Sequence, residues 1–412
     1  MLETSPTILF VDDEDLVLDG LRRQLADMGD RWRLLFASSG SAALDLLESA
    51  PVDLVVSDMR MPGMDGASLL SEVARSHPTV SRFILSGHSV REVVFGWNAQ
   101  AHQYLSKPCD RDRLVAALTR CLAIRGRIHA PDLLALISAS KGVPALPHNL
   151  SKFFQQLGTQ DCSITDLAAT VLSDIGLTAQ VLRLVNATDI LVPGEVSDVL
   201  QAIEALGCDR IRSLGVETGA FEAFNWSGVD MGAVRRLSAE GATIATLAAD
   251  IARYEGLDPQ LVEQCRCAGM LAHVGSLLLL ANWPGEMYCL QQTADLTELG
   301  RITLENRHFE ATHGQIGGSL LSLWGFNETV VEAVLHHHWP SDALDLQSTA
   351  PGPLAIVHFA QYAVEQGMSR LKAPQGLDVA YLTGCGARLD AWAGLIPAGV
   401  LLSGRGDGSL VH

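Results

Sequence analysis

The sequence predicts an α/β domain followed by an all-α domain. From residue 7 to about 123, short apolar runs alternate with amphipathic helical stretches, which is typical of a parallel sheet covered by helices. After residue 126 the β-type pattern stops, and helical patterns continue nearly to the end. The length of 412 residues exceeds one ordinary domain, and an apolar fraction of 48% supplies enough side chains for two cores.

Five strands and five helices are expected in the first domain. The strands are predicted at 7–11, 34–37, 53–57, 82–86 and 102–105, and the helices at about 14–28, 40–49, 65–76, 89–98 and 110–123. Strict alternation of this kind predicts a five-stranded, doubly wound parallel sheet. Because ligands of such sheets bind at the carboxyl ends of the strands, any chemistry is expected at that edge.

The same change of pattern gives the domain boundaries. We expect a first domain over 1–125, a linker helix over 126–142, an all-helical domain over 143–395 and a flexible tail over 396–412. Prolines 144 and 147 cannot continue a helix, so they mark the start of the second domain. Its helices are predicted at about 149–157, 163–173, 176–187, 196–206, 208–217, 230–254, 258–281, 310–323, 327–338, 351–367 and 378–393.

The charge balance argues against nucleic acid and anionic membrane as partners. The chain has 29 basic and 47 acidic residues, and 16 basic and 30 acidic residues follow residue 125. A DNA-reading helix needs a basic surface that this balance does not supply. The first residues lack the basic flank of a signal peptide, and the longest apolar run, 270–281, is too short and polar to cross a bilayer. We therefore expect no DNA, no membrane and a cytoplasmic location.

Acidic, hydroxyl and basic side chains follow the predicted strands at one edge of the sheet. Asp12 and Asp13 end the first strand, Asp58 the third, Ser86 the fourth, and Lys107 the fifth. Clustered carboxylates repel one another unless a divalent cation shares them, and Mg²⁺ prefers oxygen ligands of this type. Lys107 and Ser86 can both contact a phosphoryl group. The pattern predicts an aspartyl-phosphate site that binds Mg²⁺.

These residues resemble the CheY-like receiver domain of two-component response regulators, over about residues 5–125. The resemblance implies that Asp58 is the phosphoacceptor, that Lys107 contacts the phosphoryl group, and that Ser86 and Tyr104 form a switch pair. It implies that the Mg²⁺ ligands are Asp12, Asp13, Asp58 and the backbone carbonyl of Arg60. It also implies a histidine kinase or a histidine phosphotransfer protein as the phosphodonor.

The helical region resembles the HDOD output domain, a relative of the HD-type metal phosphohydrolases. The resemblance is carried by the stretches 143–147, 177–186, 201–207, 313–326 and 333–338. An active HD site needs a His, a His-Asp doublet and a later Asp, and the corresponding positions here are Glu240, His273, Val274 and Gln361. Because the side chain of Val274 cannot coordinate a metal, this degenerate site implies a catalytically inactive domain that acts by binding other proteins.

Thirteen histidines raise the question of another metal site. Paired ligands on one helix favour a spacing of four residues, whereas His308 and His313 are five apart and residues 336–338 are consecutive. We therefore expect structural or surface roles for these histidines and for His358. The glycines 275, 317 and 318 are expected at close helix contacts rather than in phosphate-binding loops.

Together these patterns predict a phosphorylation-controlled response regulator whose HDOD domain acts by protein–protein interaction, with cyclic di-GMP signalling as an expected context. Two alternatives stay open. One is an HD-type metal-dependent phosphohydrolase or phosphodiesterase with a non-standard metal site, and the other is a nucleotide-sensing domain without turnover. The linker contains no long disordered spacer, so phosphorylation is expected to rearrange two packed domains, with homodimer formation as one expected arrangement.

Overall fold

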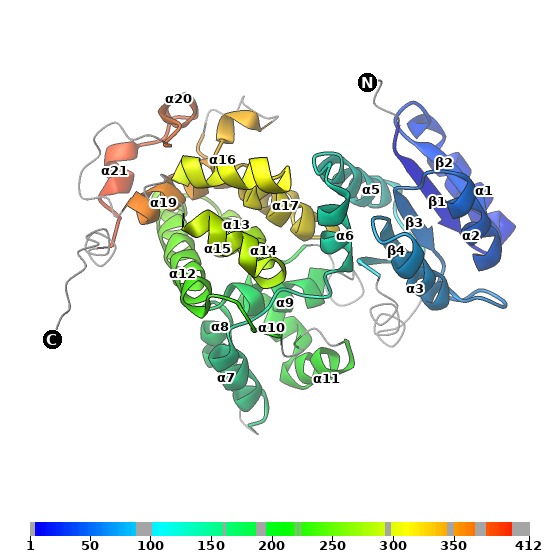
Figure 1. Cartoon of the computed structure of the whole chain (residues 1–412), viewed down its shortest axis with the longest axis horizontal. Helices are drawn as coiled ribbons and strands as arrows, with labels where there is room; N and C mark the ends of the chain where they lie inside the picture. Colours follow the sequence, from blue (N-terminus) through cyan, green and yellow to red (C-terminus); the bar gives the residue numbers. More distant parts are fainter. Residues whose placement is uncertain are drawn as a thin grey trace.

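The computed structural model describes residues 5–87, 101–159, 162–186, 195–218, 221, 224–292, 298–343, 350–366 and 376–397. Within these ranges an α/β domain is followed by a wholly helical domain, which confirms the predicted fold class (Figure 1). The helix predicted at 89–98 and the tail from residue 398 onward lie outside the described residues.

The first domain is built on a five-stranded sheet in which every pair of neighbouring strands is parallel. Its strands are β1 (Thr7–Val11), β2 (Arg33–Ala37), β3 (Leu54–Ser57), β4 (Ser81–Ser86) and β5 (Gln103–Ser106), in the spatial order β2-β1-β3-β4-β5. The central strands β1 and β3 are buried along their whole length, because helices cover both faces of the sheet. The strand order reverses between β1 and β3, which is where parallel sheets of this kind place their ligands.

Helices connect these strands, and two of them begin at side-chain caps. The described helices are α1 (Asp15–Gln24), α2 (Gly40–Ser49), α3 (Gly66–Ser76) and α5 (Arg111–Arg125), with a 3-10 turn at Ala26–Met28. Ser39 accepts a hydrogen bond from the backbone N–H of residue 42, and Asp65 accepts one from residue 68, which fixes the starts of α2 and α3. The predicted helix at 14–28 is therefore a shorter α-helix followed by the 3-10 turn.

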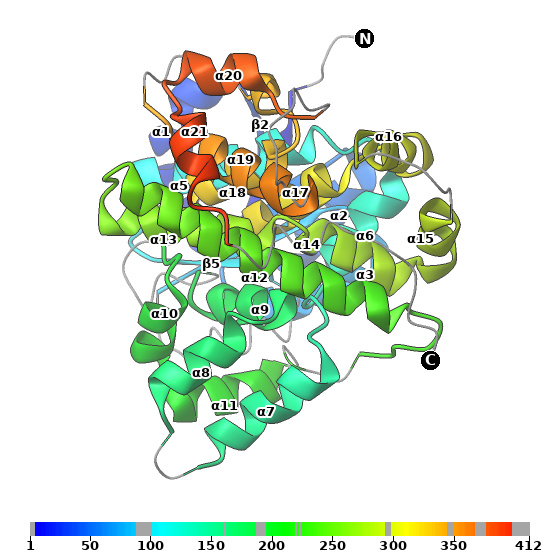
Figure 2. The same ribbon diagram turned by 90° about the vertical axis from the view of Figure 1, so that its left-hand side faces the viewer.

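The second domain packs its helices around α12, α13, α17, α18 and α19 (Figure 2). The helices before this centre are α6 (Pro131–Ala139), α7 (Pro147–Leu157), α8 (Ile164–Val171), α9 (Ile175–Asn186), α10 (Val199–Leu206) and α11 (Cys208–Thr218). Those from it onward are α12 (Met231–Tyr254), α13 (Pro259–Leu271), α14 (Val274–Asn282), α15 (Pro284–Gln291), α16 (Glu298–Phe309), α17 (His313–Leu323), α18 (Glu328–His336), α19 (Pro353–Gln366), α20 (Val379–Gly384) and α21 (Leu389–Ala393).

Three of the predicted helices of the second domain have different bounds in the structure. The helix predicted at 258–281 is two helices, α13 and α14, separated at His273. The break brings Gly275 against α17, where an added Cβ would lie 2.0 Å from the carbonyl oxygen of His313. The helix predicted at 310–323 begins only at His313, because Thr312 and Gln315 form a capping box. The pattern at 378–393 is likewise two short helices, α20 and α21.

One described segment is long and apolar enough to cross a membrane, namely Pro259–Asn282. Its most apolar window is 89% buried inside the helical domain, which is the position of a core helix. The bent pair Ile164–Val171 and Ile175–Asn186 passes the same test only if both helices are counted as one span.

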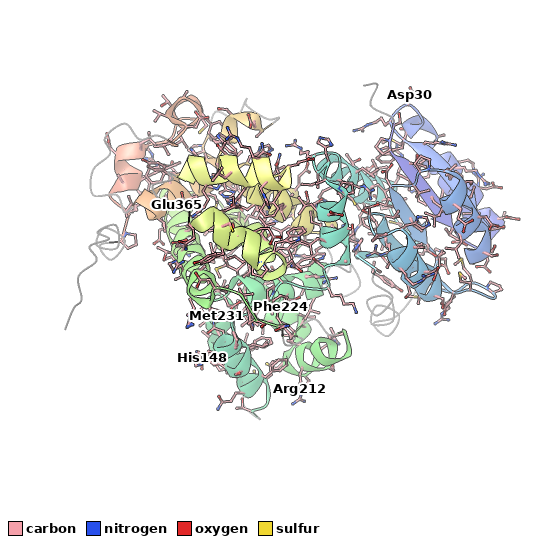
Figure 3. All side chains as sticks on the ribbon, in the orientation of Figure 1. Asp30, His148, Arg212, Phe224, Met231 and Glu365 are labelled. Carbon is pink, nitrogen blue, oxygen red and sulfur yellow. The ribbon has the colours of Figure 1, made fainter. Side chains whose placement is uncertain are left out.

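The two domains meet where β5 and α5 lie against α17. The side-chain amide of Gln103 donates to the backbone carbonyls of Ser322 and Leu323, at 3.0 and 3.2 Å. Ser322 Oγ in turn donates to the carbonyl of Arg120, and Arg120 donates to the carbonyl of Phe326. Helices α5 and α6 both contact α17, and side chains project from them (Figure 3). The last helices of the chain also pack on the helical domain, since Trp392 Nε1 donates to Glu255 on the end of α12.

A buried network of hydrogen bonds joins the linker helix α6 to the sheet. The backbone N–H of Arg82 donates to Nδ1 of His102 at 3.0 Å, so Nε2 of His102 carries the proton and donates to the carbonyl of Ser138 at 2.8 Å. The guanidinium of Arg82 also donates to this carbonyl, at 2.6 Å. The predicted linker is thus part of the contact between the domains.

Candidate functional site

The carboxyl ends of β1, β3 and β5 bring two carboxylates and one ammonium group together. Asp12 directly follows β1, Asp58 follows β3, and Lys107 follows β5. Lys107 Nζ donates to Asp12 Oδ2 at 2.6 Å and also donates to Asp58 Oδ1. The sheet therefore places side chains that are up to 95 residues apart in sequence around one cation.

Partial burial shapes the electrostatics of this group. The side chains of Asp12, Asp58 and Lys107 are 4%, 11% and 21% exposed. Burial raises the pKa of Asp58 above its ordinary value, against the opposing effect of Lys107. Burial alone would lower the pKa of Lys107, but its bonds to Asp12 and Asp58 raise it, so this lysine stays protonated. The single ammonium group of Lys107 therefore balances only one of the two carboxylate charges. The three side chains together keep a net negative charge that can attract a metal ion.

The turn after β3 holds Asp58 in a fixed orientation. The backbone N–H of Arg60 donates to Asp58 Oδ2 at 2.6 Å. Helix α3 begins close behind this turn at Gly66, where an added Cβ would lie 2.1 Å from the backbone carbonyl oxygen of Asp58. Only glycine allows this approach, so the start of α3 confines the loop that carries the acceptor carboxylate.

A cavity of about 650 Å³ opens onto Asp58 and Lys107. One wall comes from α1, and the remainder comes from the loops after β3, β4 and β5. Its lining residues are Glu14, Val17, Gly20, Leu21, Gln24, Asp58, Arg60, Leu85, Gly87, Lys107, Pro108 and Cys109. A phosphoryl group can thus reach the carboxylate of Asp58 from solvent without opening the fold.

The other predicted receiver residues lie around this group. Asp13 is exposed beside Asp12, and Tyr104 is 1% exposed in β5. Ser86 ends β4, where its Cα pairs with that of Ser106, but its side chain lies outside the described residues. The predicted roles of these residues stay predictions.

Mg²⁺ fits the side chains present at this edge. Its preferred ligands are carboxylate and carbonyl oxygens, and Asp12, Asp13 and Asp58 supply carboxylates at or beside the cavity. Burial is the main cause of the raised pKa of Asp58, and a divalent ion would favour the charged form of this carboxylate.

The four positions of the degenerate HD site lie on three elements of the helical domain. Gln361, on α19, brings its Nε2 to within 3.1 Å of Nε2 of His273, so the structure brings these two residues together. Val274 is fully buried at the start of α14, and Glu240 is half-buried on α12. Val274, which the resemblance matches to the Asp of the HD doublet, therefore fills core volume with an isopropyl group, and its assignment stays a prediction.

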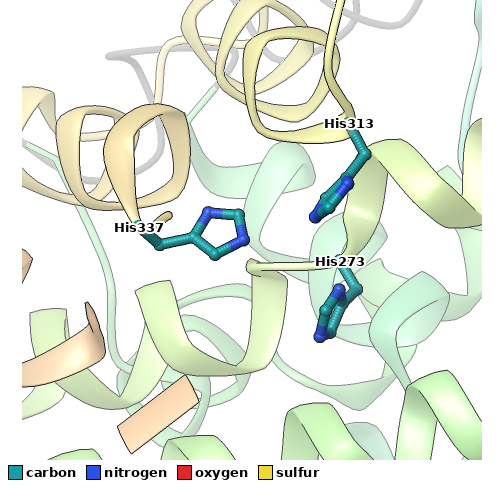
Figure 4. A group of neighbouring side chains, drawn as sticks. All are labelled: His273, His313 and His337. Carbon is teal, nitrogen blue, oxygen red and sulfur yellow. The ribbon is translucent and has the colours of Figure 1, made fainter. Parts of the chain in front are cut away.

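The structure brings together three histidines that the sequence spacing did not group, and their expected structural or surface roles stay predictions. Ring nitrogens of His273, His313 and His337 all lie within 4.8 Å of one another, and the three side chains face a common centre (Figure 4). They come from the starts of α14 and α17 and from the residue after α18. Spacing within one helix could not find this group, because each histidine belongs to a different helix. By contrast, His308 is exposed, as expected.

Comparisons with known proteins agree with this architecture. A sequence profile of the response regulator receiver domain matches residues 8–119, and a profile of the HDOD domain matches residues 143–340. The hydrogenase transcriptional regulatory protein HoxA of Cupriavidus necator is 35% identical over 138 residues, which are 32% of this chain and 28% of HoxA. The DNA-binding transcriptional regulator NtrC of Escherichia coli is 35% identical over 114 residues, which are 27% of this chain and 24% of NtrC.

The chain thus spans about a quarter of the length of these two curated relatives. Among solved structures, the MmoQ response regulator from Methylococcus capsulatus is 21% identical. Its alignment covers 62% of this chain and 98% of that chain, with a TM-score of 0.48.

Proposed function

We propose that this chain, which belongs to the two-component response regulators and joins a receiver domain to an HDOD domain, is controlled by phosphorylation of Asp58. The observation that carries the proposal is the shared hydrogen bonding of Lys107 to Asp12 and Asp58 at the mouth of a solvent-open cavity. An exposed path, an oriented carboxylate and an adjacent cation are what phosphoryl transfer to an aspartate requires.

The residues of the site divide the work of this transfer. A carboxylate oxygen of Asp58 attacks the incoming phosphorus, and the leaving group departs on the opposite side. Lys107 moves from its bond with Asp58 to the phosphoryl oxygens, while its bond to Asp12 keeps it in place. Mg²⁺, when bound by Asp12, Asp13, Asp58 and the carbonyl of Arg60, supplies positive charge that offsets the charge on the phosphoryl group.

The phosphodonor in this proposal is a histidine kinase or a histidine phosphotransfer protein. The cavity beside Asp58 is walled by Val17 and Leu21 of α1, and Leu16 on the same helix is 80% exposed. An exposed apolar side chain on the helix that forms one wall of the cavity is suited to contact a protein donor while its phosphohistidine reaches Asp58. We accordingly assign the protein to the cytoplasm, where such a donor domain would meet it.

The output in this proposal is a change in how the helical domain binds other proteins, without turnover of a substrate. Val274 and Gln361 stand where an HD phosphohydrolase needs metal-binding carboxylates, and both are buried in packed surroundings. The alternative of a phosphohydrolase with a non-standard metal site predicts turnover of a phosphomonoester or of cyclic di-GMP. The involvement of cyclic di-GMP signalling and the formation of a homodimer stay predictions.

The phosphoacceptor assignment can be tested with acetyl phosphate and Mg²⁺ on a phosphate-affinity gel. We expect the wild type to shift, Asp58→Asn to lose the shift, and a chelator to abolish it in the wild type. Asp30→Asn, which changes an exposed carboxylate, is the matched control and should shift normally. An unchanged shift in Asp58→Asn would show that another residue is phosphorylated, and this would disprove the proposal.

A second assay distinguishes a helical domain that only binds other proteins from one that hydrolyses a phosphate ester. The same purified protein is incubated with cyclic di-GMP and with a phosphomonoester in the presence of Mn²⁺, Fe²⁺ or Zn²⁺. We expect no turnover. Turnover that is lost in His273→Ala would favour the phosphohydrolase, because His273 is the one residue of the HD set that remains.

A further inference from the structure

A cluster of histidines lies in the core of the helical domain, remote from the receiver site. We propose that His273, His313 and His337, joined by His338, bind one transition-metal ion of the Zn²⁺ type in a closed structural site. The first three side chains are 0% exposed, and one nitrogen from each lies within 4.8 Å of the other two (Figure 4). This ion differs from the Mg²⁺ of the receiver domain in place, ligand type and chemistry.

Two ring nitrogens of the cluster have no hydrogen-bond partner among the described residues. They are Nδ1 of His273 and Nε2 of His337, and both are buried. Buried polar atoms are almost always partnered, so each exception needs an explanation. Nδ1 of His337 donates to the carbonyl of Val334 at 2.7 Å, which leaves the lone pair of this ring on Nε2. A metal ion would satisfy that lone pair.

His313 is supported by a buried carboxylate. Its Nδ1 lies 2.7 Å from Oε2 of Glu305, which is 1% exposed, so Nδ1 carries a proton and Nε2 has the lone pair. A carboxylate behind a metal-binding imidazole fixes the ring, raises its basicity and offsets the charge of the ion.

His338 completes a set of four imidazoles. Its Nε2 lies 3.0 Å from Nε2 of His313, and the residue is half-buried at the rim of the cluster. Ligand nitrogens around a tetrahedral Zn²⁺, with bonds of about 2.0–2.1 Å, lie about 3.3 Å apart. The His313–His338 pair is already close to this spacing, and binding of the ion would displace the proton that His338 Nε2 now donates to His313 Nε2. The other two rings need to move inward by about 1 Å to reach the same spacing. Four protein ligands leave no open position, which is typical of structural rather than catalytic zinc sites.

Metal binding by His273 would also involve Gln361 on α19. Nε2 of His273 faces the side-chain amide of Gln361 at 3.1 Å, while its Nδ1 has no partner among the described residues. When Nδ1 of His273 binds the ion, Nε2 carries the proton. The amide of Gln361 would then have to turn so that its Oε1 accepts this proton, and the turn gives up the hydrogen bond that Nε2 of Gln361 donates to Glu365.

Glycines bring the histidine-bearing helices into contact. Gly275 packs on the carbonyl of His313, where an added Cβ would lie only 2.0 Å away. At Gly314 an added Cβ would lie 2.9 Å from the carbonyl of Leu335 and 3.4 Å from the ring of His337. These contacts join α14 and α18 to α17, so the backbone holds the histidines near one another before any ion binds.

The test uses the full-length protein, stripped of metal, reloaded with Zn²⁺ and dialysed. Elemental analysis should find one Zn²⁺ per chain in the wild type. His313→Gln and His337→Gln should bind at least roughly 10- to 100-fold more weakly, because loss of a partner behind a ligand already costs that much and these variants remove a ligand itself. His308→Gln, which changes an exposed histidine on α16, is the matched control and should load like the wild type. Asp58→Asn should also load fully, which separates this site from the receiver.

Two results would overturn the proposal. One is a folded wild type that retains no Zn²⁺ and gains no thermal stability from it. The other is equal loading of His337→Gln and His308→Gln. Should the core variants fail to fold, Co²⁺ decides the matter on the wild type, because four-coordinate Co²⁺ has a strong visible absorption that octahedral surface-bound Co²⁺ lacks. A failure to phosphorylate Asp58 would not contradict the metal site, because Zn²⁺ binding by the histidines does not depend on the receiver.

Discussion

At the scale of single residues, Lys107 and the proposed Mg²⁺ would compete for the same carboxylates. Lys107 holds Asp12 and Asp58 through hydrogen bonds, and both carboxylates are also expected ligands of Mg²⁺. The ammonium group therefore balances part of the charge that the metal needs, while it supplies the donor that a phosphoryl group needs. Removing this one side chain should move the two properties in opposite directions.

We expect Lys107→Met to bind Mg²⁺ about tenfold more tightly, because loss of one positive charge about 4 Å from a divalent ion changes the energy by at least ~1 kcal/mol. Phosphorylation by acetyl phosphate should fall roughly 100-fold, which is typical of losing one charge-stabilising donor. Calorimetry measures the first effect and a phosphate-affinity gel the second. Lys152→Met, at an exposed lysine on α7, is the control. Weaker Mg²⁺ binding in Lys107→Met would show that the lysine orients the carboxylates rather than competing for them.

His102 gives the protein a sensitivity to acid. Burial lowers its pKa well below the ordinary value, with Arg82 adding to the effect and then Arg183 and Arg125, while its bond to the carbonyl of Ser138 opposes it. Nδ1 accepts the N–H of Arg82, so a proton placed there would break that bond. The folded state therefore excludes a proton that the unfolded chain takes up below about pH 6.5. His102 therefore does not change the free energy of unfolding above about pH 6.5, and it lowers this free energy as the pH falls below that value.

From pH 6.5 to 5.0 this single histidine should cost about 2 kcal/mol of unfolding free energy. Urea denaturation of the wild type and of His102→Gln should therefore give curves that converge as the pH falls. His148→Gln, at an exposed position on α7, should parallel the wild type and serves as the control. Parallel curves for His102→Gln and the wild type would show that His102 is protonated in the fold.

At the scale of secondary structure elements, the carboxyl end of α17 is capped by the other domain. The last carbonyls of a helix have no partner within it, and those of Ser322 and Leu323 accept hydrogen bonds from Gln103 of β5. Gln103 is 4% exposed, so removing its amide leaves these carbonyls buried without that donor. The junction between the domains is thus also part of a helix terminus.

We expect Gln103→Ala to destabilise the protein by about 1–3 kcal/mol, because the buried carbonyl of Leu323 loses its amide donor, whereas that of Ser322 still accepts from the backbone N–H of Gly325. Gln103→Glu should cost more, because it places a negative charge at the negative end of α17. Chemical denaturation measures both. Gln155→Ala, at an exposed glutamine on α7, is the matched control and should change little. Equal stability of Gln103→Ala and Gln155→Ala would show that water replaces the amide at the junction.

The contrast between the two candidate sites shows what a sequence can predict. The receiver residues follow strands of a parallel sheet, and the carboxyl ends of such strands share one edge. The proximity of Asp12, Asp58 and Lys107 was therefore predictable. The histidines of the second domain meet because α13 and α14 separate at His273 and because glycines let α17 approach its neighbours. Helical periodicity reports which residues share a face of one helix, and it carries no information on which helices meet.

At the scale of the whole molecule, the receiver and the helical domain form one packed body along β5, α5 and α6. Tyr104, the predicted switch residue, neighbours Gln103 on β5 and is already buried before any phosphoryl group binds. Successive side chains of a strand point to opposite faces. A shift of β5 on phosphorylation would therefore move Tyr104 on one face and the cap of α17 on the other.

The last prediction follows from this connection. Beryllofluoride with Mg²⁺, which mimics the phosphoryl group at Asp58, should change the X-ray scattering profile or the sedimentation coefficient of the full-length chain. Asp58→Asn should abolish the change. Gln103→Ala should reduce it while the receiver still binds beryllofluoride, because the contact that transmits the shift to α17 is gone. Couplings of this kind are typically about 1–3 kcal/mol, so partner binding should change roughly 5- to 150-fold rather than switch absolutely. An unchanged profile in a wild type that binds beryllofluoride would mean that the receiver surface itself is the docking site.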